Sequence, residues 1–220
     1  MSTISILGCS ADSLAVLMDI LHESKGIKKF NIYRNIESLI IPNLPLANYK
    51  YQIFEPGLFP SSSDDVVFGV AGPFNKWSVF QYYKSHAGIL EKRYITTIHK
   101  LAYVASSSMV DSGAILEPGV VVSSQSSIGF GSWIKRGVLV GHHNQIGAFT
   151  DINPGATISG KVSIGRGCII GSGAVINDNI SIGENCLIGS GSVVTKDIPS
   201  GVIAYGSPCR VVRENSKWKI

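Results

Sequence analysis

The stretch that decides the fold reads VGHHNQ-IGAFTD-INPGAT-ISGKVS-IGRGCI-IGSGAV over residues 140–175. Each block of six begins with an aliphatic residue, and an aliphatic residue stands at every sixth position from residue 104 to residue 194. A small residue often precedes it by two places, and glycine often follows it. A period of six differs from the period of about 3.6 of a helix and from the alternation of a strand. It is typical of the hexapeptide repeat, which forms a parallel β-helix.

The repeat also predicts how its residues are arranged. Three blocks close one triangular coil, so residue i lies beside residue i+18 of the next coil. The aliphatic side chains point inward and stack in ladders, while glycine suits corners where φ is positive. Neighbouring coils stabilise one another because no coil can bury its inner face alone. The ladder therefore predicts the fold and leaves the function open.

The chain before the repeat alternates short apolar runs with segments of helical spacing, which predicts a small α/β domain of Rossmann type. We expect strands at residues 4–7, 30–33 and 66–70, and helices at residues 11–21 and 76–85. Residues 43–65 contain three prolines and a Ser-Ser-Ser run, so we expect a loop there with at most one short strand.

We place a domain boundary at Ile98-His99, where the chain enters the repeat. The predicted division is a Rossmann-like domain over residues 1–97, which would bind a sugar nucleotide, and a β-helix domain with a C-terminal tail over residues 98–220.

A ligand crevice is predicted beyond the carboxyl ends of the N-terminal strands, where ligands bind in open α/β sheets. The turn at residues 8–13 lacks the three spaced glycines of a dinucleotide fingerprint, which disfavours NAD. Asp12 also argues against a phosphate held tightly there, because its charge would repel an anion. An ordinary strand-to-helix turn is an equally good interpretation. The candidate substrate-binding residues of the crevice are Gly8, Cys9, Ser10, Asn35 and Gly72.

The composition disfavours several classes of protein. The formal net charge is +4 and the Lys and Arg residues are scattered, which argues against a nucleic-acid partner. We find no apolar run long enough to span a bilayer and no basic start typical of a signal peptide. We therefore expect a cytoplasmic protein without a membrane partner, in which the four cysteines are reduced thiols.

Two adjacent histidines, His142 and His143, interrupt the repeat and are the best candidates for chemistry. The unperturbed pKa of histidine is about 6.5, which suits a general base. The residues eighteen positions away from His142 are Ser124 and Gly160, both small, so the ring has room. A solvated surface histidine without a function is the alternative. No metal site is expected, because the positions in register offer no further metal ligand.

Several features together resemble one family of proteins: the α/β unit, the Ile98-His99 entry, the unbroken repeat, the segment GHHNQIG at residues 141–147 and the closing GSPCR at residues 206–210. Over essentially its whole length the chain is similar to the sialic acid O-acetyltransferase and bacillosamine-pathway N-acetyltransferase family of sugar acyltransferases. The resemblance implies a left-handed β-helix, contrary to the usual right-handed crossover. It also implies acetyl-CoA as co-substrate and a homotrimer with active sites between adjacent β-helices.

The resemblance implies roles for individual residues. His142 matches the general base, which takes a proton from the acceptor amine or hydroxyl as that group attacks the thioester. His143 stands where many members carry an acidic residue that orients the base, so that group is missing or comes from elsewhere. Asp151 stands where many members carry a histidine near the acetyl carbonyl. It would lie at the acetyl-CoA site, hold a histidine of a neighbouring chain, or be a solvated corner residue.

The resemblance also implies how coenzyme A binds. Its pantetheine arm lies in the groove between two β-helices and needs small side chains, which Gly155, Gly173 and Gly191 supply. Lys196 and Arg210 would meet the coenzyme's phosphates. Corner glycines required by the fold, and a solvated basic tail, are the alternative interpretations of these five residues.

The sequence therefore predicts an acetyl-CoA-dependent N-acyltransferase of a nucleotide-linked amino sugar, in the synthesis of a surface polysaccharide or glycan. O-acetylation of a sugar hydroxyl, such as that of a nonulosonic acid, is the close alternative. It depends more on the base because a hydroxyl is less nucleophilic than an amine. A non-catalytic binding or scaffold protein is the alternative of another class. Ala11-Asp12 replaces the family's Gly-His, and Arg34-Asn35 replaces an acidic pair, so the acceptor stays open.

Overall fold

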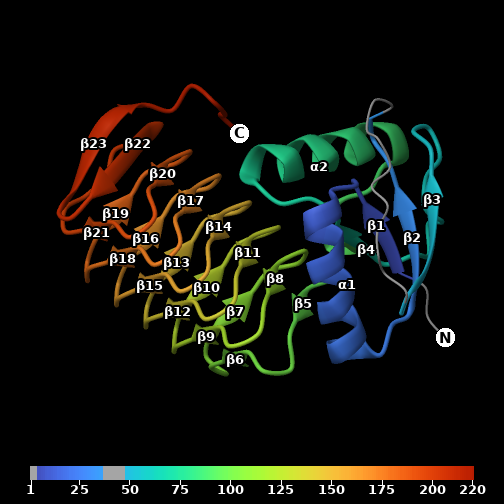
Figure 1. Ribbon diagram of the computed structural model, residues 1–220, viewed down its shortest axis with the longest axis horizontal. Coiled ribbons are helices and arrows are strands. Elements are labelled where there is room, and N and C mark those ends of the chain that lie inside the picture. The colour runs from blue at the N-terminus through green and yellow to red at the C-terminus, as the bar shows by residue number, and fades with distance from the viewer. Residues whose placement is uncertain (1–3, 37–47) are drawn as a thin grey trace.

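The computed structural model describes residues 4–36 and 48–220, and Figure 1 shows an N-terminal α/β domain packed against a β-helix. The strands of the α/β domain form one parallel sheet in the order β3-β2-β1-β4, which confirms the predicted Rossmann-like arrangement. Its elements are β1 (Ile4–Leu7), α1 (Ala11–Lys25), β2 (Lys29–Tyr33), β3 (Lys50–Phe54), β4 (Val66–Phe68), α2 (Pro73–Ala87) and the short helix η1 (Glu91–Arg93).

The predicted strands and helices of this domain are present, with differences at their ends. α1 continues to Lys25, where Gly26 (φ 69°) adopts the left-handed conformation and donates its amide to the His22 carbonyl. α2 begins earlier than predicted because Pro73 suits the first turn of a helix. β3 is the short strand expected within residues 43–65, of which residues 43–47 lie outside the described part of the chain.

The β-helix has three faces, each formed by a sheet of short strands. The eight-stranded sheet contains β5 (Thr97–Ile98), β8 (Ile115–Leu116), β11 (Trp133–Ile134), β14 (Asp151–Ile152), β17 (Ile169–Ile170), β20 (Leu187–Ile188), β22 (Val202–Gly206) and β23 (Cys209–Glu214). The six-stranded sheet contains β6 (Tyr103–Val104), β9 (Val121–Val122), β12 (Leu139–Val140), β15 (Thr157–Ile158), β18 (Val175–Ile176) and β21 (Val193–Val194). The five-stranded sheet contains β7 (Met109–Val110), β10 (Ser127–Ile128), β13 (Gln145–Ile146), β16 (Ser163–Ile164) and β19 (Ser181–Ile182).

Strands of successive coils pair in parallel and in the register that the period predicts. Ile128 pairs with Ile146, and Ile146 pairs with Ile164, each eighteen residues further along the chain. The inward aliphatic residues from residue 116 to residue 194 are at most 3% exposed. Removal of this apolar surface from water, which contributes about 25 cal/mol per Å², is the main force that holds the coils together. β22 and β23 form an antiparallel hairpin at the end of the β-helix.

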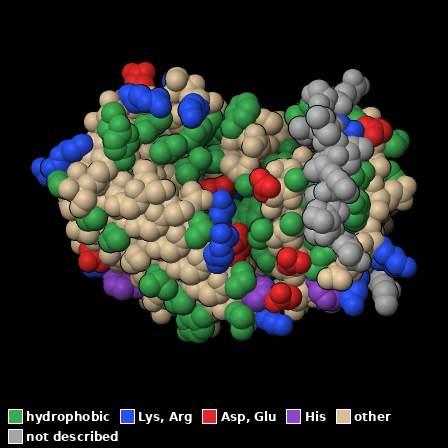
Figure 2. Space-filling model, in the orientation of Figure 1, with side chains coloured by type: hydrophobic (Ala, Val, Ile, Leu, Met, Phe, Trp, Pro, Cys, Tyr) green, Lys and Arg blue, Asp and Glu red, His purple; other side chains and the backbone are tan. Residues whose placement is uncertain are grey.

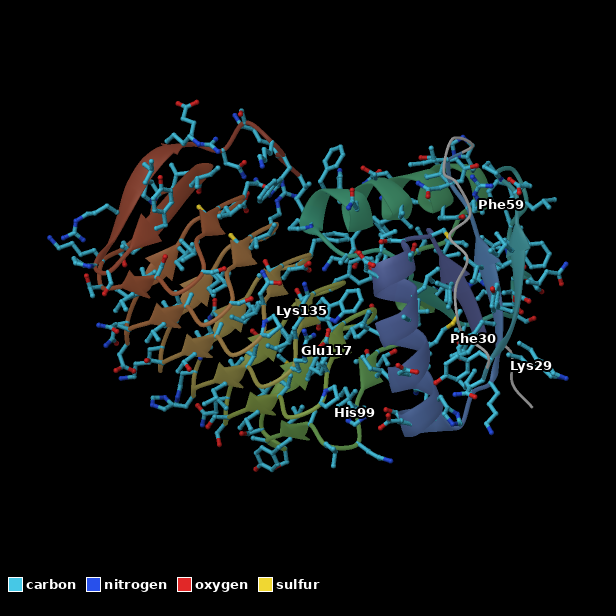
Figure 3. The ribbon with its side chains drawn as sticks, viewed as in Figure 1. Lys29, Phe30, Phe59, His99, Glu117 and Lys135 are labelled. Carbon is cyan, nitrogen blue, oxygen red and sulfur yellow. The ribbon has the colours of Figure 1, made fainter. Side chains whose placement is uncertain are left out.

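The α/β domain covers one end of the eight-stranded sheet. The outward side chains of Ile115 and Trp133 belong to the same buried apolar cluster as α1. A polar contact joins the same surfaces beside His99, which Figure 3 labels: His99 Nε2 lies 2.9 Å from Glu23 Oε2 of α1. Within the β-helix, buried Glu117 accepts the indole N–H of Trp133 at 2.7 Å. Within residues 4–36 and 48–220, the buried apolar clusters that contain α1 and α2 include no outward strand residue of the other two sheets.

β5, the first strand of the β-helix, begins one residue before the predicted boundary at Ile98-His99. That residues 1–97 and 98–220 are separate domains stays a prediction. All four cysteines are buried and free, as expected for reduced thiols. None of the helices in the described ranges combines the length and the apolar character needed to cross a bilayer.

The repeat phase can be tested on one strand. Ile164 of β16 is 2% exposed and points inward, whereas its neighbour Ser163 is exposed. Ile164→Asp should prevent cooperative folding, because an unpaired buried carboxylate is unfavourable by several kcal/mol. Ser163→Asp should leave the melting temperature within a few degrees of wild type. Circular dichroism melts of both variants check this, and a normal melt for Ile164→Asp would contradict the assigned phase.

Candidate functional site

The histidine pair lies at an exposed corner of the β-helix, between β12 of the six-stranded sheet and β13 of the five-stranded sheet. Two buried polar side chains hold this corner from inside. Ser126 Oγ (2.8 Å) and Asn144 Nδ2 (3.0 Å) both donate to the carbonyl oxygen of Gly141. Asn144 Oδ1 accepts the backbone N–H of Val162, in the next coil, at 2.6 Å. The backbone beside the histidines is therefore fixed, although both rings are exposed.

The two imidazole rings are in direct contact. His142 Nδ1 and His143 Nδ1 lie 2.9 Å apart, so one ring donates a hydrogen bond and the other accepts it. The rings meet edge to face, with centroids 5.1 Å apart. If His142 donates from Nδ1, its Nε2 carries the free lone pair that a general base needs. His143 is thus a hydrogen-bonding partner of the His142 ring.

The imidazole of His142 lies over Gly160 of the next coil. A Cβ added to Gly160 would stand 2.7 Å from both Cε1 and Nε2 of His142. The backbone of Gly160 is not in the left-handed region, so glycine is required there for space rather than for conformation. The predicted open neighbour of His142 is confirmed, and the ring fills the opening.

Four of the six predicted coenzyme residues lie along the two edges of the six-stranded sheet. Gly155, Gly173 and Gly191 occupy equivalent corners between the eight-stranded and six-stranded sheets, with φ of 70°, 65° and 67°. A Cβ on any of them would meet no atom within 4 Å, so they form an open surface that we call the glycine strip. At the opposite edge, residues 124, 142, 160, 178 and 196 hold equivalent places, and we call them the His142 column.

Lys196 belongs to the His142 column, because it follows β21 as His142 follows β12. Arg210 lies outside both groups, on β23 of the closing hairpin, where it is exposed and its Nη1 donates to the carbonyl of Cys209 at 2.8 Å. Within one chain, the structure therefore brings Lys196 into the same column as the histidine and keeps the glycine strip at the other edge.

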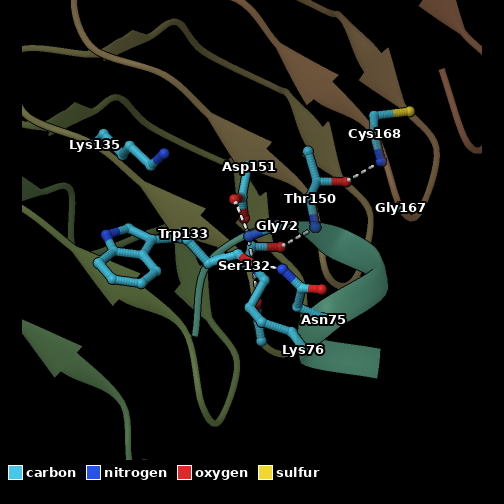
Figure 4. A network of polar contacts seen from close by, with 12 residues as sticks. Gly72, Asn75, Lys76, Ser132, Trp133, Lys135, Thr150, Asp151, Gly167 and Cys168 are labelled. Atoms are coloured by element: carbon cyan, nitrogen blue, oxygen red, sulfur yellow. Dashed lines mark hydrogen bonds and ion pairs between the residues drawn. The ribbon is translucent and has the colours of Figure 1, made fainter. Parts of the chain in front are cut away.

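Asp151 lies neither at a corner nor in solvent, so its interpretation as a solvated corner residue is wrong. It is the outward residue of β14 and is buried because α2 covers this part of the sheet (Figure 4). Its Oδ1 pairs with Lys76 Nζ at 2.5 Å, and its Oδ2 accepts the amide of Gly72 at 2.8 Å. Lys76 Nζ also donates to the carbonyl of Gly131 at 2.6 Å. With its side chain 3% exposed and both oxygens bonded, Asp151 offers nothing to a coenzyme, and we remove it from the acetyl-CoA set.

The Lys76 side chain is fully buried in this contact. Burial lowers the pKa of Lys76, and the adjacent Asp151 carboxylate opposes that change. The pair therefore joins the α/β domain to the β-helix, and its role is structural. The sequence could not predict this pairing, because 75 positions separate the two residues.

A cleft of about 500 Å³ opens at the carboxyl end of the N-terminal sheet. Three of the five predicted substrate-binding residues line it: Cys9, Ser10 and Asn35. The other lining residues are Ala11, Ile36, Val70, Phe74, Asn75, Ser78 and Val79. Burial raises the pKa of the Cys9 thiol, which keeps it protonated and argues against a nucleophilic role.

Gly8 and Gly72 do not line the cleft, which corrects their assignment. A Cβ on Gly8 (φ 84°) would come within 2.8 Å of Val70 and 2.9 Å of Val79, so this glycine serves close packing. Gly72 (φ 88°) precedes the first residue of α2 and donates its amide to Asp151. Both glycines therefore lie beside residues that line the cleft.

Two helices begin at this cleft. Ser10 and Ala11 lie at the start of α1, and Phe74 and Asn75 lie in the first turn of α2. Neither helix has a side-chain cap, so amide groups of both first turns lack a partner from a capping side chain. The two positive helix ends favour an anion in the cleft. Asp12, expected to repel an anion, is exposed and is not among the lining residues.

A larger and more open depression, of about 720 Å³, lies between the end of α2 and the β-helix, beside Phe80, Lys84 and Asp111. It contains none of the predicted site residues, so we assign it no role in chemistry. Within residues 4–36 and 48–220, no group of three or more His, Cys, Asp or Glu side chains is arranged to hold a metal ion.

Comparisons with known proteins agree on the fold. Residues 161–196 match the sequence profile of the family described as bacterial transferase hexapeptide (six repeats). No protein of curated function matches the chain. Among solved structures, a variant of perosamine N-acetyltransferase from Caulobacter crescentus, in complex with CoA and GDP-perosamine, superposes with a TM-score of 0.80 at 20% identity. The alignment covers 97% of this chain and 98% of that one.

Two further structures are similar over nearly the whole chain. WeeI from Acinetobacter baumannii has a TM-score of 0.76 at 20% identity and covers 96% of this chain and 100% of its own. The acetyltransferase domain of PglB from Neisseria gonorrhoeae, in complex with acetyl coenzyme A, has a TM-score of 0.67 at 20% identity and covers 96% and 98%. The chain therefore has the predicted fold, a Rossmann-like domain followed by a left-handed parallel β-helix.

The pair that joins the two parts of the molecule can be tested by substitution. Asp151→Ala should lower the free energy of unfolding by about 3–5 kcal/mol, because it leaves the Lys76 ammonium buried without a counter-charge. The matched surface pair is Arg166 and Glu184, which are about half exposed, and Glu184→Ala should change stability by less than about 1 kcal/mol. Urea unfolding measures the free energy of unfolding of both variants. Equal losses would contradict the structural role of Asp151.

Proposed function

We propose that this protein is an acetyl-CoA-dependent N-acyltransferase that modifies an amino group of a nucleotide-linked sugar. The observation that carries the proposal is the exposed imidazole of His142, held over Gly160 by a fixed corner, with Nδ1 bonded to His143. When His142 donates this hydrogen bond from Nδ1, its Nε2 carries the lone pair and is the base. The likeness to structures described with CoA, acetyl coenzyme A or GDP-perosamine supports this choice of reaction.

In the proposed reaction, the amine nitrogen of the sugar attacks the thioester carbonyl of acetyl-CoA. His142 Nε2 takes the proton that the amine loses, so the nitrogen does not become a cation that would simply leave again. Backbone amides stabilise the oxyanion of the tetrahedral intermediate. When the carbon–sulfur bond breaks, the proton passes to the sulfur and coenzyme A leaves as a thiol. The products are an N-acetylated sugar nucleotide and free coenzyme A.

The exposed face of the six-stranded sheet supports a homotrimer with active sites between copies. Its outward residues Tyr103, Val121 and Leu139 are apolar and 60%, 37% and 46% exposed. They pair in register along the lower edge of the β-helix in Figure 1, where hydrophobic side chains gather in Figure 2. Such a patch is typical of an interface between proteins. The His142 column and the glycine strip border this sheet on its two sides.

A cyclic trimer uses two different surfaces of each subunit, so its contacts are head to tail. Packing of one β-helix against the six-stranded sheet of another would bring the His142 column of one copy toward the glycine strip of the next. The pantetheine arm of coenzyme A would then lie along Gly155, Gly173 and Gly191, where side chains are absent. Lys196 and Arg210 would bind its phosphates.

The N-terminal cleft would hold the sugar nucleotide. Its two helix N-termini suit a diphosphate, which carries negative charge but needs no metal to bind there. Ser10 and Asn35 offer hydrogen bonds, and the half-exposed Ile36 and Phe74 offer an apolar surface to a base or sugar. The reaction would take place in the cytoplasm, where the free thiols of this chain would persist. It would serve the synthesis of a surface polysaccharide or glycan.

The test is release of the coenzyme A thiol from acetyl-CoA, with a panel of nucleotide-linked 4-amino sugars and their hydroxyl counterparts. His142→Ala should lower kcat/KM with the amino sugar by about 100- to 10,000-fold, the usual contribution of a general base, and leave the melting temperature unchanged. The matched control is His86→Ala, an exposed histidine of α2 outside the predicted site, which should keep wild-type activity.

Three other results would each change the proposal. Release with hydroxyl sugars only would establish O-acetyl transfer. Near-normal activity of His142→Ala would remove this residue as the base. No release and no binding of coenzyme A would favour a scaffold protein.

A further inference from the structure

One carboxylate of the His142 column has no place in the reaction as described so far. Asp178 lies two coils beyond His142, and its Oδ1 accepts the backbone N–H of Gly160 at 2.6 Å. Gly160 is the residue on which the His142 ring rests. We propose that Asp178 is a positioning residue, which fixes the seat of the His142 ring and places a negative charge beside it. This inference rests on the proposed function only in so far as His142 is the base.

Distances around Gly160 bring the two side chains together. The position that a Cβ on Gly160 would occupy is 2.7 Å from His142 Nε2 and 3.1 Å from Asp178 Oδ1. These distances place the carboxylate oxygen no more than about 6 Å from Nε2, the range in which a carboxylate stabilises an imidazolium. The absence of a side chain at Gly160 leaves the space between them open.

The charge matters at one moment of the reaction. His142 is neutral before transfer and becomes an imidazolium when it takes the proton of the attacking amine. A nearby carboxylate lowers the free energy of that charged state and makes Nε2 a stronger base. His143 orients the ring through Nδ1 but brings no negative charge when neutral. Asp178 thus supplies, from two coils away, the charge that an acidic residue at position 143 would have supplied.

The other titratable groups of this corner do not replace Asp178. Lys161 and Lys196 are cations, which disfavour a charged imidazole. Asp197 makes the same kind of bond as Asp178, from Oδ1 to a backbone N–H at 2.8 Å, but its partner is Ser181, in the strand β19 of the five-stranded sheet. Asp197 is therefore a matched control for the substitution of Asp178.

Two variants separate the charge from the hydrogen bond. Asp178→Asn keeps an oxygen that can accept the Gly160 amide and removes only the charge. The loss of that charge should make His142 Nε2 a weaker base. The acid limb of the profile of kcat/KM against pH should therefore move to lower pH. Asp178→Ala also removes the bond, so it should lower kcat further, and Asp178→Asn should recover that further loss.

The experiment is a pH titration of the histidine Cε1–H signals by NMR, run on the full-length protein, Asp178→Asn and Asp197→Asn. The signal of His142 is identified by its absence from His142→Ala. The proposal requires a lower pKa of His142 in Asp178→Asn and no change in Asp197→Asn. An unchanged pKa of His142, or an equal shift in both variants, would overturn it.

The titration needs no substrate, so it separates this inference from the proposed function. A lower pKa of His142 without any acetyl transfer would support the positioning role of Asp178 and contradict the transfer reaction. Transfer that depends on His142, together with an unchanged pKa and pH profile in Asp178→Asn, would support the reaction and contradict the positioning role.

Discussion

The structure depends on the hydrogen-bonded register between successive coils. The amide of Gly141 donates to the carbonyl of Ile158, and the amide of Lys161 donates to the carbonyl of His142, both at 2.8 Å. Bonds of this kind place equivalent residues of successive coils directly beside one another. A six-residue period therefore builds a buried aliphatic ladder inside and separate columns of residues outside. The glycine strip and the His142 column are two such columns, and the apolar six-stranded sheet lies between them.

The three faces of the β-helix differ because different surfaces cover them. α1 and α2 cover part of the eight-stranded sheet, where the outward residues include the apolar Ile115 and Trp133 and the carboxylate of Asp151, which is paired with a buried lysine. The outward residues of the five-stranded sheet are mostly polar. Those of the six-stranded sheet are mostly apolar, and Tyr103, Val121 and Leu139 among them are exposed. This distribution supports a different role for each sheet. The eight-stranded sheet packs against the N-terminal domain, the five-stranded sheet faces water, and the six-stranded sheet suits contact with another copy. The candidate base stands at the border of the last two.

Sequence alone predicted what depends on local spacing. The period predicted the β-helix and its register, and the small residue at position 160 predicted room for the His142 ring. Contacts between distant segments could not be predicted, which is why Asp151 was misplaced and Gly8 and Gly72 were assigned to the substrate. The role of Asn144 could have been predicted, because it is a polar residue at a place where the repeat favours small ones. Asp178 lies near His142 only because the register between coils places residues 142, 160 and 178 in one column.

The central claim is that one active site uses the His142 column of one copy and the glycine strip of another. The most direct measurement mixes two inactive variants, His142→Ala and Gly173→Asn, by joint refolding. Asparagine can adopt the positive φ of position 173, because Asn179 (φ 60°) and Asn185 (φ 55°) already adopt such values in this β-helix. Its side chain would occupy the space that the glycine strip leaves for the pantetheine arm. In a random mixture, about a quarter of the sites between copies combine two intact surfaces, so about a quarter of wild-type activity should return. Activity no higher than in the separate variants would contradict a site shared between copies.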